Sequence, residues 1–270
     1  MDSILIHLTD GQNVESCQID GLTLAARIGA KVQGVFAIPA LASTFWGYEA
    51  AEYLPVLEQQ LQNSAQKATD RFTQLAKAQS LPVECITIDN AYLSTFAEMS
   101  IGFDLLVTPQ PKSPPDSVVE MEFQAPDLVV GCACPTIVIP RTKNVETIGT
   151  KIVIAWNNSR ESSRAVRDAL PLLKLAKTVV VLGVYVKGHE APDFKSIDAY
   201  LTNHGITHSM TSEVTNELDV TETILNAANA LDSDLIIMGA WGHSRIRELV
   251  LGGVTREILE KMTIPVLMSH

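Results

Sequence analysis

The feature that most constrains the fold is an internal repeat of short apolar segments. Four segments of the first half recur in the same order in the second half: residues 4–9 match 152–157, 32–38 match 179–186, 103–107 match 233–237, and 135–139 match 265–269. The last two pairs also keep their spacing, from Asp104 to Pro135 in one half and from Asp234 to Pro265 in the other. A recurrence of this kind predicts two copies of one structural unit.

The chain has room for both copies as separate domains, because 270 residues accommodate two domains of common size. The repeat boundary falls in residues 141–150, a polar stretch that contains Gly149 and is typical of a connector. We therefore predict one domain over residues 1–143 and a second over residues 149–270.

Strand-like and helix-like segments alternate within the second copy. Strands are predicted at residues 151–156, 178–186, 206–213, 234–238 and 264–269, with helices between them, the last at residues 254–262. Ser159 is expected to cap the first helix, Pro171 to kink or end it, and Asp219 with Glu222 to form a capping box later on. This alternation predicts an α/β fold of two tandem, doubly wound parallel sheets covered by helices. Ligands of such sheets bind outside the carboxyl ends of the strands.

One segment after a predicted strand has glycines at both of its ends. Gly239 and Gly242 follow the strand, and Gly252 and Gly253 precede the short last helix. Glycine lets the backbone approach a ligand closely, and a helix N-terminus offers unpaired N–H groups and a positive dipole end. The same segment carries three basic side chains: His243, Arg245 and Arg247. This pattern favours a loop that binds nucleotide phosphates; the alternative is a tight strand-to-helix connection without a ligand.

The spacing of these glycines resembles the signature of the universal stress protein family. Gly239, two residues, Gly242, nine residues and Gly252 follow the pattern of its ATP-binding branch, which continues with Ser or Thr. This chain departs there, because Gly253 carries no hydroxyl, although Thr255 has one nearby. The repeat also resembles the tandem, Rossmann-like form of the family over nearly the whole chain. The resemblance implies that the closing strands of the two copies pair side by side as an internal pseudo-dimer, and it leaves further dimerisation open.

The resemblance further implies a nucleotide site on the second copy only. Its residues would be Asn157, Val184, Gly239, Trp241, Gly242, Gly252, Gly253, Val254 and Thr255. Asn157 stands where the family usually has an Asp that contacts the base or ribose, and a role as a turn or cap is the alternative. Val184 would line the adenine pocket or serve as a core valine, and Trp241 would stack on a ligand or, as we favour, pack over the pocket mouth.

The first copy lacks the glycines of this loop. Pro109, Lys112, Glu122 and Phe123 occupy the equivalent positions. Proline removes a hydrogen-bond donor, and Glu122 together with Asp116 would repel a polyphosphate. We therefore expect no nucleotide in the first copy. Its residues 40–53 contain four aromatic side chains that could form an interaction patch or pack a helix over the sheet, and we favour packing.

Composition narrows the class of protein. A net charge of −11 argues against a general nucleic-acid or anionic-membrane surface. The first residues carry no basic leader, and the apolar stretch at 128–139 is too short to span a bilayer, so we expect a cytoplasmic protein. Its four cysteines should then be reduced thiols. Cys132 and Cys134 could suggest a metal, but no second ligand pair is evident, and we favour small buried side chains and no tightly bound metal.

No catalytic signature accompanies the glycine loop. The sequence has no Walker-type phosphate loop, nucleophile elbow or H-E-x-x-H, and Glu248, the carboxylate nearest the glycines, is interpreted as a solvated charge. The resemblance implies a stress-response protein that binds ATP, with Mg²⁺ as a companion, or a related adenine nucleotide, without efficient turnover. Two alternatives remain: a ligand-free interaction scaffold, and a slow ATP hydrolase or nucleotidyl-transfer enzyme. Enzymatic activity is therefore uncertain and, at most, a weak ATPase.

Overall fold

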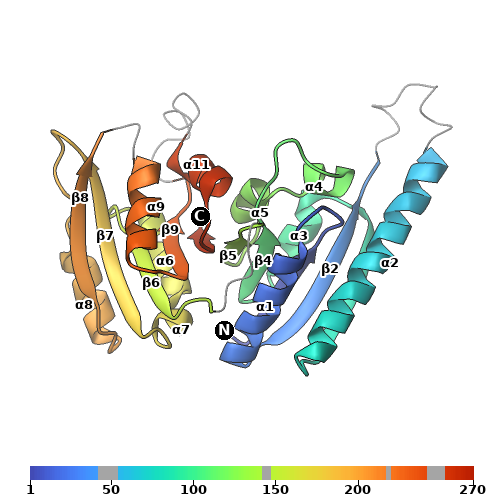
Figure 1. Cartoon of the computed structure of the whole chain (residues 1–270), viewed down its shortest axis with the longest axis horizontal. Helices are drawn as coiled ribbons and strands as arrows, with labels where there is room; N and C mark the ends of the chain where they lie inside the picture. Colours follow the sequence, from blue (N-terminus) through green and yellow to red (C-terminus); the bar gives the residue numbers. More distant parts are fainter. Residues whose placement is uncertain (42–53, 142–146, 217–219, 242–252) are drawn as a thin grey trace.

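The computed structural model describes residues 1–41, 54–141, 147–216, 220–241 and 253–270. Within these ranges the strands form one ten-stranded sheet in the order β3-β2-β1-β4-β5-β10-β9-β6-β7-β8 (Figure 1). Read outward from its centre, the sheet has the same order in each half: β5-β4-β1-β2-β3 on one side and β10-β9-β6-β7-β8 on the other. The predicted fold class, an α/β protein with two doubly wound parallel units, is confirmed.

The elements of each half follow one another in the predicted alternation. The first half contains β1 (Ser3–Leu8), α1 (Glu15–Ile28), β2 (Lys31–Pro39), α2 (Leu54–Ala78), β3 (Val83–Ala91), α3 (Leu93–Ser100), β4 (Leu105–Pro109), α4 (Val118–Glu122), α5 (Ala125–Gly131) and β5 (Thr136–Ile139). The second contains β6 (Lys151–Ala155), α6 (Arg160–Asp168), α7 (Leu170–Leu173), β7 (Thr178–Val186), α8 (Lys195–Asn203), β8 (Ser209–Thr215), α9 (Val220–Ala230), β9 (Leu235–Gly239), α11 (Val254–Lys261) and β10 (Val266–Ser269).

The two halves meet through their closing strands, as the resemblance implies. β5 and β10 pair antiparallel, with Ile137 opposite Leu267, whereas all other neighbouring strands run parallel. Arg27 of α1 adds a second link, because its Nη2 donates to the carbonyl oxygens of Gly149 (3.0 Å) and Leu175 (3.1 Å). Backbone pairing and side-chain hydrogen bonds therefore join the halves at the centre of the sheet.

The repeat extends to individual hydrogen bonds at the amino ends of the strands. The Asp104 carboxylate accepts from the N–H groups of Asp2 (2.6 Å) and Ser3 (3.1 Å), at the start of β1. Both bonds lower the pKa of Asp104, and the bond from Asp2 has the larger effect. The Asp234 carboxylate accepts in the same way from the N–H of Lys151 (2.8 Å), at the start of β6. The matched spacing of the two aspartates thus reflects a shared structural role.

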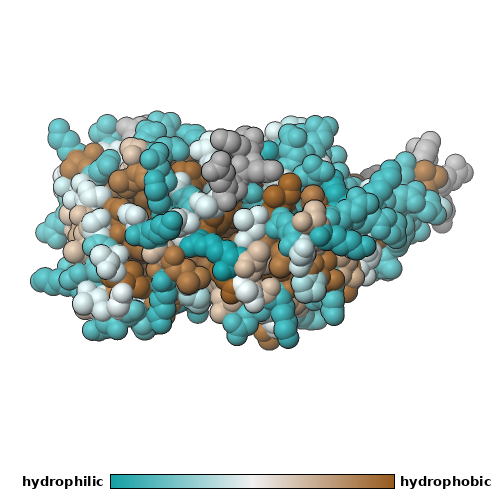
Figure 2. All heavy atoms as spheres, turned by 60° about the horizontal axis from the view of Figure 1, so that its bottom comes forward, coloured by the Kyte–Doolittle hydropathy of each residue, from teal (hydrophilic) through white to brown (hydrophobic). Residues whose placement is uncertain are grey.

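Helices cover both faces of the sheet, so its central strands are buried. β4, β5 and β10 are buried along their whole length, as parallel strands between helical layers must be. The outermost strands, β3 and β8, are largely exposed. Figure 2 brings the end nearest the N-terminus forward and shows hydrophobic residues there in separate patches divided by hydrophilic ones. Such scattered apolar side chains are normal on a protein surface. Among the described residues, no helix combines the length and the apolarity that crossing a bilayer requires.

Local predictions hold with some shifts at the ends of elements. Ser159 caps α6, because its Oγ accepts from the N–H of Ser162 at 3.1 Å. The interruption predicted near Pro171 is confirmed: the helical segment is divided into α6 and α7, and Pro171 stands in the first turn of the second. β8 begins later than predicted, since Gly205 takes a left-handed φ of 72° and keeps the next residue in the turn that ends α8. Asp219 and most of residues 40–53 lie outside the described residues.

Candidate functional site

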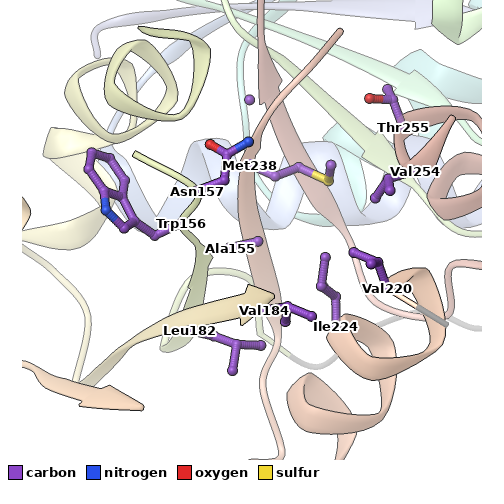
Figure 3. Close-up of a pocket in the computed structure, with 11 residues that line it drawn as sticks. Ala155, Trp156, Asn157, Leu182, Val184, Val220, Ile224, Met238, Val254 and Thr255 are labelled. Atoms are coloured by element: carbon purple, nitrogen blue, oxygen red, sulfur yellow. The ribbon is translucent and has the colours of Figure 1, made fainter. Parts of the chain in front are cut away.

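A pocket opens at the carboxyl ends of β6, β7 and β9, between α9 and α11 (Figure 3). Its volume is about 150 Å³. Among the described residues, most of the lining side chains are apolar and none is charged: Ala155, Trp156, Asn157, Leu182, Val184, Val220, Ile224, Met238, Gly239, Val254 and Thr255. This is the edge of the sheet at which ligands of doubly wound folds bind.

The register of the strands explains why these residues meet. Ala155, the last residue of β6, lies opposite Leu182 of β7 on one side and Met238 of β9 on the other. Ile224 reaches the same space from α9 (Figure 3). Because Ala155 has only a methyl group at the centre of this set, room remains above it.

Asn157 supplies a polar group at the pocket edge. Its Oδ1 accepts from the N–H of Ser159 at 3.2 Å, so the amide oxygen faces the start of α6. The amide nitrogen is then turned toward the Met238 side of the pocket (Figure 3). Asn157 therefore has the turn role considered from the sequence, and its amide still offers a hydrogen-bond donor beside the pocket.

Gly239 is required by the packing of α6 against β9. A Cβ atom at this position would lie 2.5 Å from the carbonyl carbon of Glu161 and from the backbone nitrogen of Ser162. Such contacts with backbone cannot be relieved by a side-chain rotation. Gly239 also lines the pocket. Its packing against α6 is by itself sufficient to require glycine, without any contribution from a ligand.

The N-terminus of α11 borders the pocket. Gly253 is the N-cap residue, and no side chain among the described residues caps this end of the helix. Val254 and Thr255, its first residues, line the pocket, so the positive end of the helix dipole lies at the pocket rim. The Thr255 hydroxyl is 3% exposed and accepts from the N–H of Trp241 at 3.2 Å. It therefore anchors the chain that leaves β9.

Trp241 lies apart from this pocket. Its ring lines a different groove, with Pro111 and Lys112 of the first half and Leu259 of α11. Its ring centroid is 6.4 Å from that of His270, and its φ of 48° is left-handed, which is uncommon for a large side chain. Trp241 is therefore a packing residue of the second-half core and of this other groove, and it does not cover the mouth of the pocket as we expected.

Several of the predicted site residues thus come together. Asn157, Val184, Gly239, Val254 and Thr255 line one pocket, with Gly253 at the adjoining helix cap. The remaining members of the predicted loop lie outside the described residues: Gly242, His243, Arg245, Arg247, Glu248 and Gly252. Sequence reasoning missed the apolar lining, namely Ala155, Leu182, Val220, Ile224 and Met238. The available signal was that Ala155 is the last residue of β6 and Met238 the last but one of β9.

The equivalent place in the first half is filled by aromatic side chains. His7 of β1 corresponds to Ala155 of β6. The pair Ile6–Val107 in the β1–β4 ladder is equivalent to Ile154–Ile237 in the β6–β9 ladder, and His7 and Ala155 directly follow Ile6 and Ile154. The His7 ring is 2% exposed and packs against Phe96 (4.9 Å between centroids) and Phe123 (6.3 Å). Its Nδ1 lies 3.0 Å from the Thr108 Oγ1. Burial, with a smaller effect of Arg141, lowers the pKa of His7 to about 3, so the ring is neutral near neutral pH.

An ion pair occupies the neighbouring loop region of the first half. Arg141 Nη2 lies 2.6 Å from Glu120 Oε1, and the two side chains are 11% and 5% exposed. The Glu120 carboxylate also accepts from the N–H of Asp116 (3.0 Å) and lies where a Cβ atom on Gly11 would be. The sequence prediction named Glu122 together with Asp116 as acids that would repel a polyphosphate; Glu122 is exposed, and a third acid, Glu120, is the buried carboxylate of this region.

The described residues contain no group of three or more His, Cys, Asp or Glu side chains placed to hold a metal ion. All four cysteines are free thiols. Burial raises the pKa of Cys132 to about 11 and that of Cys134 to about 12, so both remain protonated near neutral pH.

Comparison with known proteins gives consistent similarities. Residues 198–270 match the family model described as the universal stress protein family. A universal stress protein of Synechocystis is 30% identical over 140 residues, and the match covers 49% of this chain and 46% of the relative, so the chain spans about half the length of that relative. A universal stress protein from Archaeoglobus fulgidus has a similar structure, with a TM-score of 0.73, 16% identity, and coverage of 99% of this chain and 97% of that chain.

A second structural neighbour is a putative universal stress protein from Pseudomonas aeruginosa. It superposes with a TM-score of 0.56 at 17% identity, covering 100% of this chain and 93% of the other. At these identities the structural similarity concerns the fold.

Proposed function

Because this chain is a UspA-like protein, we propose that its second half binds ATP or a related adenine nucleotide and acts as a regulatory module in a stress response, without efficient turnover. The base would enter the apolar pocket beside Ala155 and Ile224. The phosphates would lie toward the N-terminus of α11, where Gly253 and the first backbone N–H groups face the pocket rim.

One observation supports this proposal most strongly: in the half that carries the family match, an open apolar pocket adjoins a helix N-terminus that no described side chain caps. Apolar cavities on the order of 150 Å³ accept a flat aromatic ring such as benzene. A pocket that opens to the surface can accept the larger purine, with its apolar faces against the walls. Asn157 would then donate to an acceptor on the base or ribose, because its oxygen is committed to Ser159.

The same proposal assigns a different role to each half. Residues 149–270 would form the nucleotide domain, and residues 1–143 a domain without a phosphate loop that supports it as an internal pseudo-dimer. Mg²⁺ would accompany the nucleotide through its phosphate oxygens, as is usual for this ion. Whether two such chains dimerise further does not affect the site.

The chemistry of the described lining supports binding without efficient turnover. In the part of the chain that the structure describes, none of the pocket residues is a carboxylate, histidine or lysine that could act as a general base. Steady release of ADP from Mg-ATP would therefore favour the slow-hydrolase alternative.

Isothermal titration calorimetry with Mg-ATP tests the proposal. Ala155→Leu extends an apolar side chain into the pocket, so we expect binding at least tenfold weaker than for the wild type. Leu231→Ala, a change at an exposed residue that follows α9, is the control and should leave affinity unchanged. Absence of any binding by the wild type would leave the ligand-free scaffold as the better description. Equal affinity of Ala155→Leu and the wild type, with the variant still folded, would place the nucleotide elsewhere.

A further inference from the structure

A side chain from the first half holds the C-terminal end of α11. Gln110 directly follows β4 and is 7% exposed. Its Nε2 donates to the carbonyl oxygens of Leu259 (2.9 Å) and Glu260 (3.2 Å), with that of Met262 at 3.4 Å. The last carbonyl groups of a helix have no partner within the helix, so this amide satisfies groups that would otherwise need water.

Gln110 is itself fixed within the first half. Its N–H donates to the carbonyl of Ile139 at 2.8 Å, which extends the β4–β5 ladder by one bond. Its carbonyl accepts from Arg141 Nε at 2.7 Å, and its Oε1 accepts from the N–H of Arg141 at 3.3 Å. Arg141 in turn pairs with the buried Glu120. The end of α11 is thus attached to a rigid part of the other half.

At the position equivalent to Gln110, the second half offers no matching attachment in return. Ala240 is the counterpart of Gln110, because it directly follows β9 and its N–H donates to the carbonyl of Ser269 at 2.8 Å, just as that of Gln110 donates to Ile139. An alanine side chain cannot reach the carbonyl groups that end α5. The connection therefore runs from the first half to the helix that borders the pocket, and the repeat does not reproduce it.

We propose that Gln110 is a positioning residue that sets where α11 stands and thereby the shape of the pocket in the other half. α11 has eight residues, and a helix of this length moves as one unit. A change at Leu259 and Glu260 is therefore passed to Val254 and Thr255, which line the pocket. The effect on ligand affinity rests on the proposed nucleotide binding, whereas the effect on α11 does not. By linkage, a bound nucleotide strengthens this attachment as much as the attachment strengthens binding.

Gln110→Met tests this proposal, because it keeps a similar shape and removes the donor. Gln74→Met, at an exposed glutamine of α2, is the matched control. Amide hydrogen exchange is measured across the chain without nucleotide, and Mg-ATP affinity is measured by calorimetry. We expect amides of α11 in Gln110→Met to exchange at least fivefold faster, those of β9 to be unchanged, and Mg-ATP to bind at least fivefold more weakly. Gln74→Met should match the wild type in both.

Two results would overturn the proposal. The first is unchanged exchange in α11, which would mean that the Gln110 amide does not hold the helix. The second is faster exchange with unaltered affinity, which would mean that the position of α11 does not govern the pocket. If the wild type bound no Mg-ATP, the proposed function would fail, and the exchange result alone would still decide whether Gln110 positions α11.

Discussion

The two halves of this chain share one strand order and differ in what occupies the carboxyl edge of the sheet. In the first half the edge is filled by His7, Phe96 and Phe123, whose rings contact one another. In the second half Ala155 stands where His7 would, and a pocket of about 150 Å³ remains. The fold therefore creates the location, and the volume of a few side chains decides whether it is open.

The polar groups at this edge differ in the same way. The first half places the Arg141–Glu120 ion pair against Gly11, whereas the second half has the N-terminus of α11, which no side chain in the described part of the chain caps. A buried ion pair satisfies its own charges and leaves nothing to attract an external anion. The comparison suggests that one copy of the repeat became structural support while the other kept the features of a binding site.

The largest effect is expected from breaking the ion pair of the first half. Arg141→Met leaves the Glu120 carboxylate buried without its partner and should lower the free energy of unfolding by about 3–5 kcal/mol. Urea denaturation measures this value. The double variant Arg141→Met, Glu120→Gln should recover most of the loss, since it removes the uncompensated charge. A single-variant cost below about 1 kcal/mol would contradict the view that this pair supports the first half.

Gly239→Ala tests the structural reason for the first glycine of the loop. The added methyl group meets the backbone of α6, so we expect a loss of about 3 kcal/mol in unfolding free energy, in the upper part of the range for overpacking. Gly102→Ala is the control, because its Cβ would meet only the Met99 carbonyl oxygen at an ordinary 3.7 Å. Equal stability of Gly239→Ala and the wild type would show that packing against α6 does not require glycine.

His7 should make the first half sensitive to acid. Its pKa is about 3 in the folded protein and about 6.5 when unfolded, so below pH 6.5 the unfolded state takes up a proton that the folded state excludes. Stability therefore falls as the pH drops from 6.5 toward 3, by about 2 kcal/mol between pH 7 and pH 5. His7→Gln should remove this part of the pH dependence in urea titrations. An identical slope for His7→Gln and the wild type would argue against a neutral, buried His7.

The smallest effect concerns the polar edge of the proposed nucleotide pocket. Asn157→Ala removes one donor to the ligand and should weaken Mg-ATP binding about fivefold, equivalent to about 1 kcal/mol. Ser159 still caps α6 in this variant, so thermal stability should change little. Calorimetry measures the affinity for Mg-ATP and a thermal melt measures the stability, so the two effects can be separated. Unaltered affinity would restrict Asn157 to its role in the turn.

The sequence allowed the fold to be predicted more completely than the site. The matched apolar segments and the aspartates at 104 and 234 indicated two α/β units, because buried parallel strands and their spacing are local signals. Ala155 and Met238 could not be recognised as pocket residues, since apolar side chains at strand ends look like core until the neighbouring strands are in register. The position of Trp241 depends on its left-handed backbone and on contact with the first half.

The acid of the first-half loop shows the same limit. A constant shift between the copies aligned Glu122 with Gly252, but α4 turns Glu122 outward and Glu120 inward. The helical periodicity of α4 decides which of the two carboxylates is buried. A linear alignment of the two copies contains no information on this helix.

A crystal structure with a non-hydrolysable ATP analogue and Mg²⁺ tests the central claim most directly. The account predicts base density beside Ala155 and Ile224, phosphate density at the start of α11, and no ligand near His7. Nucleotide density in the first half, or an empty second-half pocket in crystals saturated with the analogue, would contradict it.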